Sequence, residues 1–251
     1  MTTAVVDPLI STMTIRRMVP LHESSRRLRR LSPDAPRVYG VAVLDDISRR
    51  RWWPLESVTT TDRLADMFEA AVAELGNRRA VAQQLAATFT HAVLGRVVTL
   101  LVLEGRAWDA GPGNLWMHVD SEGAIDWAAV VDPTLRVLPD DPATSDVVRL
   151  PNELALATWT AHRCHRSLDP IFDRLHQLSR GALTPAAMWR MAGSAVVITA
   201  TQVPLLIGSG ELTCMRRGQA VLDALTGFGL PVRALNAPGR RSCNLGKPCL
   251  V

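Results

Sequence analysis

The chain has 251 residues, of which 47% are hydrophobic and 21% charged, and its formal net charge is +4. This length suits one large domain or two small ones, and the composition is that of a globular protein rather than a disordered chain. Lys247 is the only lysine, so arginine carries almost all of the positive charge, as expected of a GC-rich genome.

The first part of the chain, residues 1–36, is rich in Ser, Arg and Pro. We expect it to be partly extended, with a cluster of arginines on a solvated, mobile surface. The cluster consists of Arg26, Arg27, Arg29 and Arg30. We expect no nucleic-acid partner, because no aromatic residues interleave with the cluster and no helix-turn-helix or zinc-finger spacing is present.

The second part, residues 37–135, is expected to combine helices and strands. A strand is predicted at 38–44, followed by a helix that Thr60 or Thr61 caps and Gly76 ends. A second, almost wholly apolar helix over 78–103 is predicted to lie in the centre of the fold. Strands near 115–119 and 124–130, joined by a turn, then predict an antiparallel hairpin.

The third part, residues 136–251, is predicted to be mainly helical. The first long helix is expected to kink or break at Asp169-Pro170, and Thr184 is expected to cap the next one. A last amphipathic helix is predicted near 211–228, before a tail that contains cysteines. The predicted fold class is therefore α+β, mainly α, with central apolar helices and a small antiparallel sheet.

No segment reads as a secretory signal or a comfortable membrane span. Charged residues interrupt the first twenty positions, and the apolar stretch 192–207 is short and contains polar residues. We therefore expect a cytoplasmic protein without a membrane span, whose cysteines are reduced unless a metal holds them.

The tail reads RRSCNLGKPCLV from Arg240 to Val251 and carries Cys243 and Cys249. With the stretches PAAMWRMAGSAVV and LWMHVD upstream, this ending resembles the FhuF-like ferric siderophore reductases, whose members end in Arg-Arg-Ser-Cys-Cys followed by Cys-x-x-Cys. The resemblance covers most of residues 60–251 and implies a FhuF-like fold. It further implies a [2Fe-2S] cluster held by four thiolates, an electron donor protein and a siderophore-like substrate.

The tail departs from the family pattern, because Asn244 and Gly246 stand where two of the four ligands belong. We therefore expect the cluster to be incomplete or absent. Several alternatives remain open. Two chains of a homodimer could share a cluster through Cys243 and Cys249, or Cys164, Cys214 or a histidine could complete the set. The tail cysteines could also form a disulfide, or be unligated remnants.

A second candidate metal group is HRCHR, which contains His162, Cys164 and His165. In a helix His162 and His165 are three positions apart and share a face, a spacing that can chelate zinc. The competing interpretation is a pair of partly exposed surface histidines.

A candidate pocket is expected between the central helices and the hairpin. Its predicted lining is Trp108, Trp116 and Arg96, with His91 and His118 as the catalytic candidates for general acid–base chemistry. Two functions follow as alternatives to an iron-chelate reductase. One is a cluster-free scaffold reused as a small-molecule enzyme of specialised metabolism, and the other is a non-catalytic ligand-binding protein.

Overall fold

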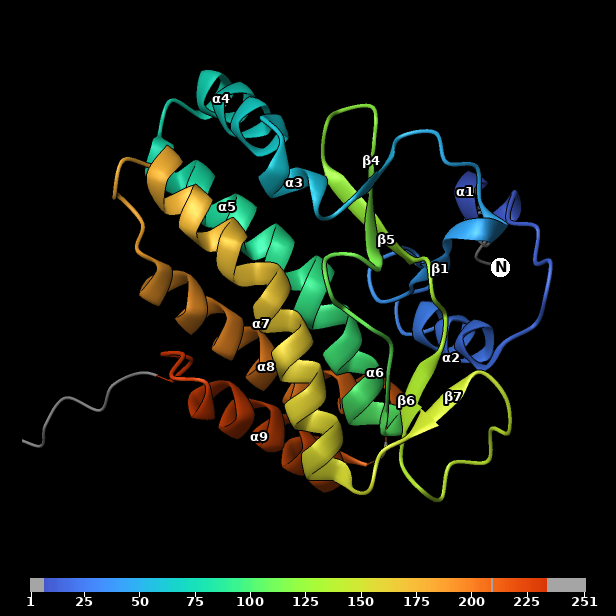
Figure 1. Ribbon diagram of the computed structural model, residues 1–251. Helices are drawn as coiled ribbons and strands as arrows, with labels where there is room; N and C mark the ends of the chain where they lie inside the picture. The colour runs from blue at the N-terminus through green and yellow to red at the C-terminus, as the bar shows by residue number, and fades with distance from the viewer. Residues whose placement is uncertain (1–6, 209, 234–251) are drawn as a thin grey trace, which may run out of the picture.

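A long central helix organises the protein. The computed structural model describes residues 7–208 and 210–233 (Figure 1). The central helix consists of α5 (Arg78–Thr90), a five-residue π turn η2 (His91–Gly95) and α6 (Arg96–Glu104). Its apolar side chains are almost all buried, as the sequence predicts for a core helix.

Three further long helices pack around the central one (Figure 1). They are α7 (Glu153–Leu178), α8 (Pro185–Ile207) and α9 (Glu211–Gly227). The predicted cap of α8 is confirmed, because the Thr184 side chain accepts a hydrogen bond from the backbone N–H of Ala187. The predicted break at Asp169-Pro170 is wrong, because α7 continues through Pro170.

A small mixed sheet covers one side of the central helix, with strand order β1-β5-β4-β2. The strands are β1 (Ala42–Val43), β2 (Trp52–Pro54), β4 (Leu115–Val119) and β5 (Ile125–Val130). The predicted hairpin is confirmed as the antiparallel β4–β5 pair. Side chains such as Met117 face the main core, whereas Trp116 and Trp127 face a smaller apolar cluster on the other side.

A second, three-stranded sheet has the order β3-β6-β7. Its strands are β3 (Arg106–Ala107), β6 (Leu135–Val137) and β7 (Val147–Arg149). Two short helices, α3 (Ser57–Thr60) and α4 (Arg63–Leu75), lead from β2 to the central helix. Asp62 rather than a threonine occupies the N-cap position of α4, and Gly76 ends the helix at φ 66°, as predicted.

The N-terminal region is more ordered than predicted. The chain forms α1 (Pro8–Ser11), α2 (Pro20–Arg29) and, after β1, the 3₁₀ turn η1 (Leu44–Asp46). The expectation of a partly extended, mobile region is wrong, because Leu21 and Leu28 of α2 are buried in the main core. The predicted strand at 38–44 shrinks to Ala42–Val43.

The main core draws side chains from both sides of residue 136, for example Phe89 and Phe172. The fold class is α+β and mainly α, as predicted. Two helices of the described chain, Arg78–Glu104 and Pro185–Ile207, are long and apolar enough to cross a membrane. The most apolar stretch is 83% buried in the central helix and 39% buried in Pro185–Ile207, and because core helices of soluble proteins pass the same test, the two helices are weak evidence for a membrane span.

Candidate functional site

A cavity of about 320 Å³ lies where the start of α1, the loop 34–38 and strand β5 meet. We call it the Asp126 cavity. Its lining residues are Asp7, Pro8, Asp34, Ala35, Pro36, Arg37, Val38 and Asp126. In Figure 1, α1 lies beside β1, away from the long helices.

A β-bulge places Asp126. His118 pairs with Trp127 and Val119 with Ile125, so Asp126 is the extra residue on β5. Bulges change the direction of a side chain relative to the regular alternation of a strand. Here the carboxylate of Asp126 reaches the His118 ring, with 2.6 Å between its Oδ1 and Nδ1 of His118.

His118 is nearly buried, with 6% of its surface exposed, and its ring packs at 5.2 Å from the ring of Trp52. The Asp126 contact fixes the tautomer in which Nδ1 carries a proton. Nε2 has no hydrogen-bond partner in the part of the chain that the structure describes. A carboxylate–histidine pair of this kind can take up and release a proton.

The guanidinium of Arg37 bonds to two carboxylates of the cavity lining, those of Asp7 and Asp126. Its Nε lies 2.6 Å from Oδ2 of Asp7, and its Nη1 donates to Oδ2 of Asp126. The result is a chain of charged groups from Asp7 through Arg37 and Asp126 to His118. Charge-assisted bonds of this type are stronger and better oriented than neutral ones.

Two of the predicted site residues hold the loop that forms the cavity wall. The buried guanidinium of Arg96 donates to the carbonyl oxygens of Arg37, Gly40 and Asp126, the last two at 2.7 and 3.0 Å. His91 donates from Nε2 to the carbonyl oxygen of Val38 at 2.8 Å. Arg96 and His91 therefore shape the cavity from behind.

Burial controls the protonation of these two side chains. Burial lowers the pKa of Arg96 to about 9, opposed by the nearby Asp126 carboxylate, so the guanidinium stays protonated at neutral pH. Burial and the positive charge of Arg96 lower the pKa of His91, so its ring is neutral. The hydrogen bond from Nε2 to the carbonyl of Val38 opposes the lowering of the pKa of His91 and is also made by the neutral ring.

The structure separates the two tryptophans that were expected to line one pocket. Trp108 is fully buried in the main core, whereas Trp116 packs against the smaller cluster on the far side of the sheet. A pocket lined jointly by Trp108 and Trp116 is therefore not formed. His118, His91 and Arg96 lie behind the lining of the Asp126 cavity, where they bond to Asp126, to Val38 and to the backbone of the loop.

The candidate metal group on α7 has no third ligand among the described residues. His162 is exposed and His165 partly exposed, and both rings pack against Phe228. Cys164 is fully buried, and burial raises the pKa of its thiol, which disfavours the thiolate that a metal needs. Residues 7–208 and 210–233 contain no group of three His, Cys, Asp or Glu side chains placed to hold a metal ion.

The two described cysteines are buried against the central helix. Cys164 and Cys214 contact the carbonyl oxygens of Val93 and Val102. The predictions for Cys243 and Cys249 fall outside the described residues. Completion of their cluster by Cys164, Cys214 or a histidine therefore stays a prediction.

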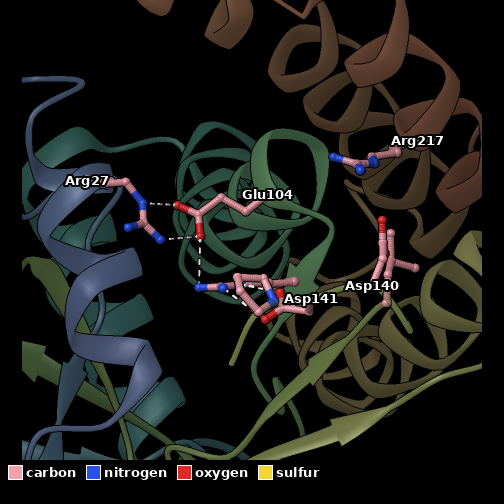
Figure 2. A pocket seen from close by; sticks show the side chains of 8 residues that line it. Arg27, Glu104, Asp140, Asp141 and Arg217 are labelled. Carbon is pink, nitrogen blue, oxygen red and sulfur yellow. Dashed lines mark hydrogen bonds and ion pairs between the residues drawn. The ribbon is translucent and has the colours of Figure 1, made fainter. Parts of the chain in front are cut away.

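A second cavity, of about 370 Å³, is lined by charges that compensate one another (Figure 2). Figure 2 shows Arg27 of α2 directed at Glu104 at the end of α6, with 2.6 Å between Nε and Oε1. Arg106 is paired with Asp141, also at 2.6 Å, and Arg217 with Glu153 at 3.0 Å. We interpret these pairs as structural links that join α2 to α6, β3 to the β6–β7 connection, and α9 to α7.

No protein-family model, no curated protein and no solved structure matches this chain.

The sequence analysis missed Asp126, Arg37 and Asp7. Asp126 lies inside the predicted hairpin, but only the bulge turns it toward His118. Arg37 and Asp126 are 89 positions apart, and no local pattern predicts such a pair. The one readable signal was a charged residue in the middle of an otherwise apolar strand, AIDWAAV.

Proposed function

We propose that this protein binds a small molecule, an iron chelate or a chemically related metabolite, in the Asp126 cavity. The Asp126–His118 pair then exchanges protons with that molecule. The proposal is supported by one observation above all: a carboxylate on a cavity wall that is bonded at once to a buried histidine and an arginine. The resemblance to the FhuF-like reductases adds the class of substrate.

Proton transfer suits this class of substrate chemically. Iron(III) chelators bind the metal through acidic oxygens, and a proton delivered to such an oxygen weakens its hold on the metal. A carboxylate and an imidazole that share a hydrogen bond can supply and recover that proton near neutral pH. Arg37 would keep the carboxylate in place while the proton moves.

Binding and proton transfer can be tested with ferric citrate and a ferric trihydroxamate as probes. We expect Asp126→Asn to lower the affinity measured by calorimetry about tenfold or more, because the carboxylate that holds His118 and Arg37 in place is lost. His118→Gln should instead alter the pH dependence of iron release to a competing chelator. Asp173→Asn, an exposed site on α7, is the control. Unchanged affinity in Asp126→Asn, or no binding by the wild type, would refute the proposal.

Turnover separates the catalytic alternatives from simple binding. A wild-type protein that binds a chelate without changing its rate of iron release would be a non-catalytic ligand-binding protein. A rate that rises with the protein and falls with His118→Gln would support an enzyme. We place either activity in the cytoplasm, as expected from the sequence.

A reductase is the second candidate, favoured by the Arg-Arg-Ser-Cys sequence that ends at Cys243. A reductase needs an electron donor protein and a cluster, whose ligands would have to include residues outside the described part of the chain. Protein purified without oxygen would give the answer through its visible spectrum and its iron and sulfide content. About one iron and one sulfide per chain would support two chains of a homodimer sharing one cluster. Colourless protein without iron would refute cluster-based electron transfer.

A further inference from the structure

A third cavity, of about 360 Å³, adjoins the Asp126 cavity, because both are lined by Asp7 and Pro36. We call it the arginine cavity. Its lining residues are Asp7, Ile10, Ser11, Arg26, Arg29, Arg30, Pro33 and Pro36. The two cavities therefore form neighbouring parts of one surface depression beside α1 and α2.

The spacing of the arginines on α2 explains why three of them reach this cavity. Positions 26, 29 and 30 are three and four residues apart and share one face of the helix. Arg27 points to another face, where it pairs with Glu104 (Figure 2). Leu21 and Leu28 anchor the helix in the core and so fix the rotation of both faces.

The three arginines differ from those of the cavity in Figure 2 in that they lack carboxylate partners among the described residues. Arg26, Arg29 and Arg30 make no ion pair with a carboxylate in residues 7–208 and 210–233, whereas Arg27, for example, has one. Arg29 has a single hydrogen bond, to the hydroxyl of Ser25 at 3.1 Å. The one carboxylate of the cavity, Asp7, is already bonded to Arg37.

Electrostatics make this arrangement costly without an anion. Burial and the like charge of Arg26 lower the pKa of Arg29, a sign that its positive charge is poorly compensated. Basic residues in the last turn of a helix do interact favourably with the helix dipole, by about 0.3–1 kcal/mol. That interaction accounts for their place along α2, but not for their convergence on one cavity.

We infer that Arg26, Arg29 and Arg30 form a subsite for an oxyanion, a carboxylate or phosphate group carried by the molecule in the Asp126 cavity. Guanidinium groups bind both kinds of oxyanion through paired N–H donors. The inference rests on the proposed function for the rest of the ligand, though the subsite can be tested without it. An elongated, anionic metabolite fits the two adjoining cavities, with its negative end at the arginines.

The test uses the full chain and two free anions, citrate and inorganic pyrophosphate. Arg26 and Arg30 are exposed, so Arg26→Gln/Arg30→Gln should fold normally, which thermal unfolding will verify. Arg79→Gln/Arg190→Gln is the matched control, because it removes the same charge from exposed positions elsewhere. Calorimetry should show affinity for at least one anion about tenfold or more lower in the first variant, and less than twofold lower in the control.

The two anions identify the chemistry of the group that binds. Tighter binding of citrate would point to a carboxylate ligand, and tighter binding of pyrophosphate to a phosphate ligand. The inference is overturned if the wild type binds neither anion at millimolar concentration. Equal weakening by both double variants would also overturn it, because it would show a non-specific effect of net charge.

The subsite and the proposed function can fail separately. If Arg26→Gln/Arg30→Gln weakens anion binding while Asp126→Asn leaves chelate binding unchanged, the subsite stands and the proposed function does not. If Asp126→Asn weakens chelate binding while the double arginine variant leaves both anions unaffected, the subsite is overturned and the proposed function stands.

Discussion

Replacement of Arg96 by methionine tests how much the cavity wall depends on one buried guanidinium. Arg96 is 2% exposed and donates to three backbone carbonyls around the Asp126 cavity. Methionine has a similar length and no donor, so all three carbonyls lose the guanidinium, while that of Gly40 keeps another donor, the indole N–H of Trp127 at 3.2 Å. The Nε of Arg96 makes no hydrogen bond within the described chain, so its removal breaks no further hydrogen bond.

The magnitude follows from those three contacts. A hydrogen bond to a charged group contributes about 1.5 kcal/mol or more, so three are worth roughly 4.5 kcal/mol. Part of this, about 1–2 kcal/mol, is recovered because a charge no longer has to be buried. We expect the free energy of unfolding to fall by about 3 kcal/mol. For a protein of this size, the melting temperature should drop by about 6–12 °C.

Urea unfolding and thermal melting measure the loss of stability in Arg96→Met. Faster hydrogen exchange in peptides spanning 34–41 would locate that loss in the loop. Arg27→Met is the matched control, because Arg27 is about half exposed in its pair with Glu104 and should cost about 1 kcal/mol or less. A loss in Arg96→Met no larger than in Arg27→Met would refute the reasoning. Unchanged exchange in 34–41 would refute the assigned role in the loop.

Three further outcomes are expected. Because burial and Arg96 lower the pKa of His91, the contribution of its neutral ring is present above the ordinary pKa of about 6.5 and is lost as the pH falls. The melting temperature of the wild type should thus exceed that of His91→Gln most at pH 7.5 and least at pH 5. Gly193→Ala should destabilise the protein by about 1–3 kcal/mol in urea, since the added Cβ would meet the carbonyl oxygen of Val232. With the other three cysteines changed to serine, Cys164 should resist a thiol reagent until the protein unfolds.

Each of these has a control or a contradicting result. Gly113→Ala is the control for Gly193→Ala, because a Cβ at Gly113 meets nothing within 4 Å. Equal losses of unfolding free energy in the two variants would contradict the steric argument. A difference between wild type and His91→Gln that grows toward pH 5 would show that His91 is protonated in the folded protein. Rapid modification of native Cys164 would show that α7 opens readily.

The sequence was sufficient for most helices and for the hairpin, because their signals are local. Thr184-Pro185 marks the start of α8 and Gly76 the end of α4, each through the backbone chemistry of a few adjacent residues. The start of α2 is equally local, since Pro20 stands at its first position, but the surrounding Ser and Arg residues favour an extended chain. The segment forms a helix instead, because Leu21 and Leu28 are buried against the core.

The candidate site could be predicted only in part, because its contacts are long-range. His118, His91 and Arg96 stood out as polar side chains in apolar segments, and the structure places all three beside one cavity or its wall. Their partners could not be read from spacing. Asp126 depends on a bulge in β5, and Arg37 reaches it from a loop far away in the chain.

The π turn in the central helix has a consequence for how that helix can vary. In a regular α-helix, residues five apart point about 140° away from each other. In η2 the backbone N–H of Arg96 bonds to the carbonyl of His91, which brings both side chains toward the same loop. Deletion of one residue from 91–95 would therefore restore a regular α-helical turn and leave α6 near its present rotation, whereas deletion of one residue from α5 would turn α6 by about 100° about its axis. The phase of this helix, as much as its composition, sets the shape of the cavity.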